Sequence, residues 1–341
     1  MSDLPSGWTS RAPGLDDLPA LVALRAADKE PWTGSASVDR DAVESEVAGA
    51  ASWTRRQAVA LDPDGVVRGW VVVHDRAAGR TMLHVYVDRN IEDDETRDAV
   101  AAWSYAYVEQ QAEEICRLRE VGETRLDASP YAEDVEQRTW LARAGYAKRR
   151  TWLQMTRPVA PEEATSLPGP REGVTIRRVE SHENGLPVAV DLQTVHDMLE
   201  KSFEDHFNSY RESFPEFLQR LREDPGHRWD HWWLAFVDVE GHPGGQQVPA
   251  GALVGTVLQE NSAGHEGTYV EYIGVHRDAR GRGVAKALLH TVIADAARRG
   301  RDRVGLEVDD DSPTGADGLY HSMGWVTDYV TESWFKELVL G

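Results

Sequence analysis

The chain has 341 residues, 41% of them hydrophobic, and its 58 acidic and 37 basic residues give a formal net charge of −21 at pH 7. Nucleic acids and anionic membranes bind basic surfaces, so this charge argues against both as partners. The length predicts two domains. A single cysteine, no long apolar run and no basic-then-apolar leader lead us to expect a cytoplasmic protein without disulfides.

The predicted elements follow one order twice along the chain. Each half begins with a short strand, continues through helices to three strands and a long helix, and closes with a strand, a helix and a Gly-aromatic turn. In the first half we expect the short strand at 8–11, the three strands at 56–61, 66–74 and 81–88, and the long helix at 95–117. In the second half we expect the same elements at 174–178, 232–238, 252–259, 268–276 and 283–299. Strands alternating with helices predict an α/β (α+β) fold with a mixed sheet, and the repetition indicates a duplication.

A proline-rich segment separates the two halves. Residues 157–171 contain four prolines and show little hydrophobic periodicity, which is typical of a linker. We therefore expect one domain at 1–156 and a second at 172–341.

The most informative motif is a basic, glycine-rich turn between a strand and a helix of the second half. The turn and the start of the helix are Arg280, Gly281, Arg282, Gly283, Val284 and Ala285. Glycines let successive amides converge, the helix start offers unpaired donors, and the arginines add positive charge, which together suit a pyrophosphate. The spacing fits neither the P-loop G-x-x-x-x-G-K-[ST] nor the dinucleotide fingerprint G-x-G-x-x-G.

The turn does match R-x-x-G-x-A, with Arg280, Gly283 and Ala285 at the fixed positions. In this motif the second half resembles the GCN5-related N-acetyltransferase (GNAT) superfamily, whose acyl-CoA loop has the form Q/R-x-x-G-x-G/A. The likeness continues downstream in Leu319-Tyr320 and in the Gly-aromatic pair that follows. Departures from the family pattern include Ser312, which stands where Asn is usual, and a Trp in place of the common Phe.

This resemblance implies two tandem GNAT-like domains, each a mixed, mainly antiparallel twisted sheet flanked by helices. It also implies acetyl-CoA as co-substrate, lying in a splay between the fourth and fifth strands, and direct attack by an amine in a ternary complex. No histidine pair has zinc-like spacing with an accompanying acid, so we expect no metal. The expected acetyl-CoA contacts are Ile273, Gly274, Val275, Arg280, Gly281, Arg282, Gly283, Val284, Ala285 and Ser312.

Two side chains are candidates for proton transfer. Glu271 lies two residues before Ile273 on the same strand, within reach of an ammonium acceptor directly or through one water, so we interpret it as the general base. The alternative is a solvated or ion-paired strand residue. Tyr320 matches the family tyrosine that can protonate the departing thiolate, and its alternative is a packing role.

The first half lacks the chemistry of this turn. Residues 92–95 are all acidic where the second half has 280–283, and four carboxylates would repel a pyrophosphate. The counterpart of Tyr320 is Leu141, which has no hydroxyl. We therefore expect the first half to be a degenerate copy without a CoA loop.

The leading hypothesis is an acetyl-CoA-dependent N-acetyltransferase acting on a primary amine of a small molecule. Its tandem layout is loosely similar to mycothiol synthase, and residues 203–210 are a candidate acceptor segment or, alternatively, an ordinary amphipathic helix. An acetyltransferase of a peptide or protein amine stays open. So does a different class, a non-catalytic acyl-CoA sensor. The sequence leaves the oligomeric state open.

Overall fold

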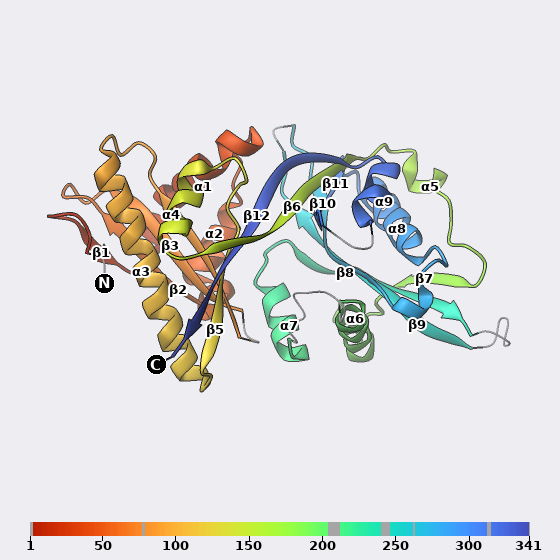
Figure 1. Cartoon of the computed structure of the whole chain (residues 1–341). Coiled ribbons are helices and arrows are strands. Elements are labelled where there is room, and N and C mark those ends of the chain that lie inside the picture. Colours follow the sequence, from red (N-terminus) through yellow and green to blue (C-terminus); the bar gives the residue numbers. More distant parts are fainter. Residues whose placement is uncertain are drawn as a thin grey trace.

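The computed structural model describes residues 3–76, 79–203, 212–239, 246–261, 263–311 and 315–340. Within these residues the strands form one twelve-stranded sheet with helices against both of its faces (Figure 1). The strands of the first half are β1 Thr9–Arg11, β2 Arg55–Leu61, β3 Val67–Asp75, β4 Arg80–Val87, β5 Glu123–Ala128 and β6 Ala147–Pro158. Those of the second half are β7 Val174–Arg178, β8 His227–Asp238, β9 Gln247–Leu258, β10 Gly267–Val275, β11 Arg303–Asp309 and β12 Val326–Val339.

The helices divide in the same way between the halves. The first half has α1 Leu18–Thr33, α2 Arg40–Ala48, α3 Asp94–Arg119 and α4 Val135–Arg143, with short 3₁₀ turns at Leu15–Asp17 and Ala50–Thr54. The second half has α6 Ala189–Ser202, α7 Phe214–Arg222, α8 Val284–Arg298 and α9 Ala316–Ser322, with a 3₁₀ turn at Arg277–Ala279, and α5 Glu163–Ser166 lies between the halves. None of the helices described is long and apolar enough to cross a bilayer.

The two halves exchange their closing strands. The sheet order is β1-β2-β3-β4-β5-β12-β6-β11-β10-β9-β8-β7, so β12 lies between β5 and β6, and β6 lies between β12 and β11. Figure 1 shows β6 and β12 running side by side across the middle of the molecule. Each half therefore completes its sheet with a strand from the other half.

Helices cover both faces of the sheet in each half. In β3, Val71 and Val73 join the core under α3, while Trp70 and Val72 join a second core with α1 and α2 residues. A strand that is buried on both faces reads as a continuous apolar run. The second half repeats this arrangement, with α8 against one face and α6 and α7 against the other.

The parallel strands β10 and β11 separate part of the way along their length. They pair only from Thr268 to Val270 against Val304 to Leu306, although β10 continues to Val275 and β11 to Asp309. A register shift between Val270 and Tyr272 against β9 marks a bulge at this point, and a bulge bends a strand and increases its twist. The bulge and the splay together position the candidate site.

Candidate active site

The glycine-rich turn joins the end of β10 to the start of α8. Gly281 and Gly283 have φ of 79° and 83°, in the left-handed region that favours glycine. Gly283 is the N-cap of α8, and no side chain caps the helix. Among the described residues, no acceptor satisfies the amides of Gly281, Gly283, Val284 and Ala285. Unpaired amides at a helix start form an anion-binding site.

Cationic side chains surround and fix the turn. Arg282 donates from Nη1 and Nη2 to the Asp238 carbonyl at 3.3 and 3.2 Å, which ties the turn to the end of β8. Arg280 is exposed. The side chain of Arg171, which the sequence did not single out, lies 3.0 Å from the position of a Cβ on Gly283. A side chain at position 283 would be strained by the positive φ, and Arg171 would have to move to make room for it.

Four other expected contacts of acetyl-CoA have surroundings that explain either their residue type or the side to which their backbone faces. Gly274 is buried, and a Cβ there would lie 2.8 Å from Ser202 of α6. Val284 is 1% exposed and anchors the first turn of α8 in the core. Ile273 and Val275 pair with β9 on one side only, so their backbone faces the splay on the other.

The equivalent place in the first half is filled by its own side chains. Strands β4 and β5 pair only from Arg80 to Met82 and then separate, but Gln137 of α4 donates to the Val85 carbonyl at 3.2 Å. At the start of α3, the Asp93 carboxylate accepts the Thr96 amide at 2.9 Å. One carbonyl at the edge of β4 and one amide at the start of α3 are thus occupied in the first half.

Glu271 is the extra residue of the β10 bulge, between Val270, which is opposite Gly255, and Tyr272, which is opposite Val254. Bulges frequently re-aim a side chain beside a functional site. The Glu271 side chain is half-buried, and no hydrogen bond joins its carboxylate to any residue in the described ranges.

The surroundings of Glu271 favour its neutral form. Removal from water, followed by repulsion from Asp224, raises its pKa to about 7, with a smaller contribution from Glu307. Attraction to Arg220 and Arg76 opposes this rise. A carboxylate with a pKa near neutrality can both accept and release a proton at working pH.

A second carboxylate, Glu307, lies across the splay on β11. Its Oε2 accepts Gln154 Nε2 at 2.6 Å, and the same amide donates to Thr331 at 3.1 Å. The Glu307 side chain is exposed at the surface, but neighbouring protein groups displace part of the water around its carboxylate. This desolvation raises its pKa, and the hydrogen bond from Gln154 opposes the rise. Gln154 belongs to β6, so the exchanged strand of the first half holds this carboxylate.

Tyr320 of α9 is 7% exposed and packs in the core beside Trp325, with ring centroids 5.8 Å apart. Burial raises its pKa to about 12. The phenol therefore keeps its proton at neutral pH and is a weaker acid than a solvent-exposed tyrosine.

Two predicted features fall on residues that the structure does not describe. Ser312 falls outside the described residues, as does the candidate acceptor segment apart from Phe203. No group of three or more potential metal ligands occurs in the described part of the chain.

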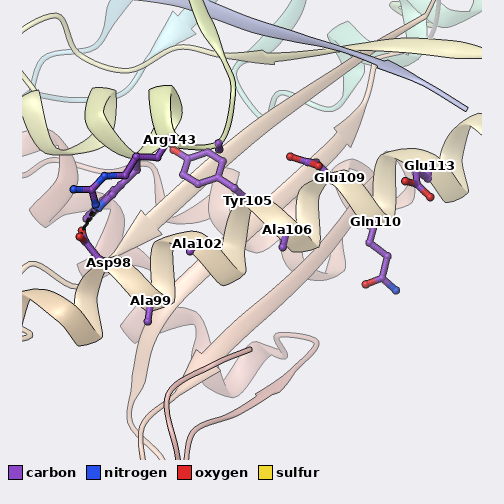
Figure 2. Close-up of a pocket in the computed structure, with 11 residues that line it drawn as sticks. Asp98, Ala99, Ala102, Tyr105, Ala106, Glu109, Gln110, Glu113 and Arg143 are labelled. Carbon is purple, nitrogen blue, oxygen red and sulfur yellow. Dashed lines mark hydrogen bonds and ion pairs between the residues drawn. The ribbon is translucent and has the colours of Figure 1, made fainter. Parts of the chain in front are cut away.

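A groove of about 780 Å³ lies elsewhere, between α3 and α4 of the first half (Figure 2). Its charged groups are paired within the protein: Asp98 accepts from Trp140 and Arg143, and Glu109 accepts from Lys336 at 2.6 Å. It has no glycine turn and no free cation, so it does not share the chemistry of the α8 turn.

Arg76, Arg220 and Asp224 were missed by sequence reasoning. Arg220 and Asp224 follow α6 by some twenty residues, and their charges reach Glu271 through tertiary packing. Arg76 belongs to the first half, between β3 and β4. Glu307 had a recognisable signal, because it is a single charged residue inside the apolar run of β11.

Comparison with known proteins agrees with this geometry. Residues 192–325 match the model of the acetyltransferase (GNAT) family. A solved GCN5-related N-acetyltransferase from Sphaerobacter thermophilus is similar over 99% of this chain and 98% of its own, with 23% identity and a TM-score of 0.72. A tandem GNAT protein from the clavulanic acid biosynthesis pathway is similar over 98% of this chain and 99% of its own, with 14% identity and a TM-score of 0.66.

At these identities the solved structures establish a shared fold. The predicted mixed α/β architecture with a mainly antiparallel sheet is confirmed. The looser likeness to mycothiol synthase is untested by these matches and stays a prediction. The segment that matches the acetyltransferase (GNAT) family, residues 192–325, spans the β10–α8 turn.

Proposed function

We propose that this protein transfers the acetyl group of acetyl-CoA to a primary amine of a small molecule, by direct attack in a ternary complex. One observation carries the proposal. The β10–β11 splay leaves backbone groups unpaired, leads to an uncapped glycine turn, and has a carboxylate of pKa about 7 at its bulge. The same chain fills the equivalent splay in its first half.

The residues at the turn fit a pyrophosphate. The amides of Gly281, Gly283, Val284 and Ala285 are unpaired among the described residues, and Arg280 and Arg171 lie beside them. We assign the pantetheine to the free edge of Ile273 and Val275, where it would pair as an added strand. Arg282 serves by holding the turn in place.

Acetyl-CoA supplies the activated acyl group, and the protein's own groups orient the reactants and move protons. Glu271 accepts the proton that the acceptor's ammonium must lose before it can attack. Tyr320 donates its phenolic proton to the sulfur that leaves. Holding two reactants in line can lower the barrier by about 7 to 11 kcal/mol, so the proton-transfer groups need to contribute only a modest further reduction.

We assign no separate acetyl-transfer activity to residues 1–156, with 157–171 as the linker and 172–341 as the catalytic domain. The support is chemical: Gln137 and Asp93 occupy the donors and acceptors that a CoA would need. The first half instead contributes groups to the catalytic surroundings, among them Gln154 on Glu307.

The test measures free thiol released from acetyl-CoA by the full-length protein with a panel of small primary amines. We expect thiol release that depends on both acceptor and enzyme. The same panel with Glu260→Gln should match wild type, because Glu260 is an exposed residue outside the site. Thermal stabilisation by acetyl-CoA without thiol release from any amine, peptide amines included, would refute the proposal and favour an acyl-CoA sensor.

A further inference from the structure

Arg76 is a residue of the first half whose electrostatic neighbours include groups of the second half. It follows β3 directly, and its amide donates to the Arg80 carbonyl at 3.0 Å, which fixes the backbone of the turn. The charge of Arg76 is close enough to Glu271 to favour the ionised carboxylate. The same guanidinium interacts with Arg220 and Tyr272. Arg76 therefore belongs to the surroundings of the reaction centre.

The guanidinium of Arg76 is poorly satisfied by its neighbours. Its Nε is buried without a hydrogen-bond acceptor. Its Nη1 donates to the Met82 sulfur at 3.0 Å, and a thioether is a weak acceptor. No carboxylate in the described ranges forms an ion pair with it. Burial, followed by repulsion from Arg220, lowers its pKa to about 10, and attraction to Tyr272 and Glu212 only partly opposes this.

The neighbouring cation differs in this respect. Arg220 donates to both oxygens of Glu212, with Nε and Nη2 distances of 2.9 and 2.7 Å, and lies over the Tyr272 ring at 5.2 Å. Its charge is neutralised by the Glu212 carboxylate. Among the described residues, Arg76 has no such ion pair.

Charges of both signs thus surround the expected position of the acceptor. Glu271 and Glu307 provide carboxylates for an ammonium, and Arg76 provides a guanidinium for an anion. An uncompensated buried charge is costly, and a guanidinium binds carboxylates and phosphates with two parallel hydrogen bonds.

We propose that Arg76 binds an anionic group of the acceptor, so that the substrate is an amine that also carries a carboxylate or a phosphate. This inference rests on the acetyl transfer proposed above. It makes the first half a specificity element, because the anion-binding side chain comes from a domain without a CoA turn.

The test compares matched acceptors that differ by one charge: L-amino acids against their amides, and glucosamine 6-phosphate against glucosamine. We measure thiol release by wild type, Arg76→Gln, Arg76→Lys and the control Arg117→Gln, an exposed arginine of α3. We expect wild type to prefer one of the anionic members. Arg76→Gln should raise KM for that member about 10- to 100-fold, the range of a charge-assisted hydrogen bond, which is a larger change than for its neutral partner, and should leave the affinity for acetyl-CoA unchanged.

The two pairs distinguish a carboxylate from a phosphate, and Arg76→Lys should restore part of the preference. Equal losses for charged and neutral acceptors, or no preference in wild type, would overturn the role of Arg76 while acetyl transfer stands. Calorimetry of the same compounds with CoA present separates the two proposals. Anion-dependent binding that Arg76→Gln abolishes, without any thiol release, would support Arg76 and refute the transfer reaction. No anion-dependent binding would refute Arg76.

Discussion

Replacing Glu271 with Gln should impair catalysis and stabilise the fold at the same time. Folding raises the pKa of this carboxyl from its ordinary 4.5 to about 7. The folded protein therefore favours the protonated form, and its stability falls as the pH rises from about 4.5 to about 7. Glutamine is neutral at every pH, so Glu271→Gln removes this penalty. The gain in free energy of unfolding should grow through that window and stay constant above it.

The magnitude follows from the shift. Each pKa unit corresponds to about 1.4 kcal/mol, and the solvent that reaches this half-buried carboxyl reduces the effect. We expect the advantage of Glu271→Gln to be about 1 kcal/mol larger at pH 8 than at pH 5.5, measured by urea unfolding with Glu260→Gln as control. The kcat/KM of the variant should fall about 100-fold, within the range of general-base catalysis. A variant that is less stable than wild type at pH 8, or fully active, would refute the assignment.

Three other outcomes follow from the same geometry. Gly283→Glu should abolish acetyl-CoA binding in calorimetry, whereas Gly264→Glu, another positive-φ glycine in a distant turn, should bind normally; unchanged affinity in the first variant would contradict the turn assignment. Tyr320→Phe should lower kcat about 10- to 100-fold with little effect on acetyl-CoA affinity, and intact turnover would leave the tyrosine a packing role. Glu307→Gln removes a charge that raises the pKa of Glu271, so the inflection of the kcat/KM profile near pH 7 should move to lower pH; a rise would contradict it.

Local pattern was sufficient to predict most elements of the catalytic half. The helix expected at 283–299 is α8 Val284–Arg298, and the strand expected at 268–276 is β10 Gly267–Val275. Periodicity and the glycine turn decide both, because they act within a few residues of chain. The start of β8 was wrong by five residues. It begins at His227, and an irregular register between His227 and Trp232 interrupts the alternation on which the prediction depended.

The exchange of closing strands could not be predicted in this way. Both β6 and β12 alternate in the same manner whether each joins its own half or the other, so burial does not distinguish the two arrangements. The proposed role of Arg76 could not be predicted for the same reason. Nothing near residue 76 indicates that its guanidinium will lie beside Glu271, because only tertiary structure brings the two together.

The exchange explains why a half without a CoA turn is an integral part of the molecule. Strand β6 supplies the inner neighbour of β11, with Met155 opposite Leu306, and carries the Gln154 that holds Glu307. A second contact joins the halves at Glu223, the residue after α7, which accepts from Arg55 at 2.6 Å and from Thr54 at 2.7 Å. Removing residues 1–156 would expose the edge of β11 and leave Glu223 without its cation. The sheet of the second half is therefore incomplete without the first half, which supplies one of its strands and the side chain that fixes Glu307.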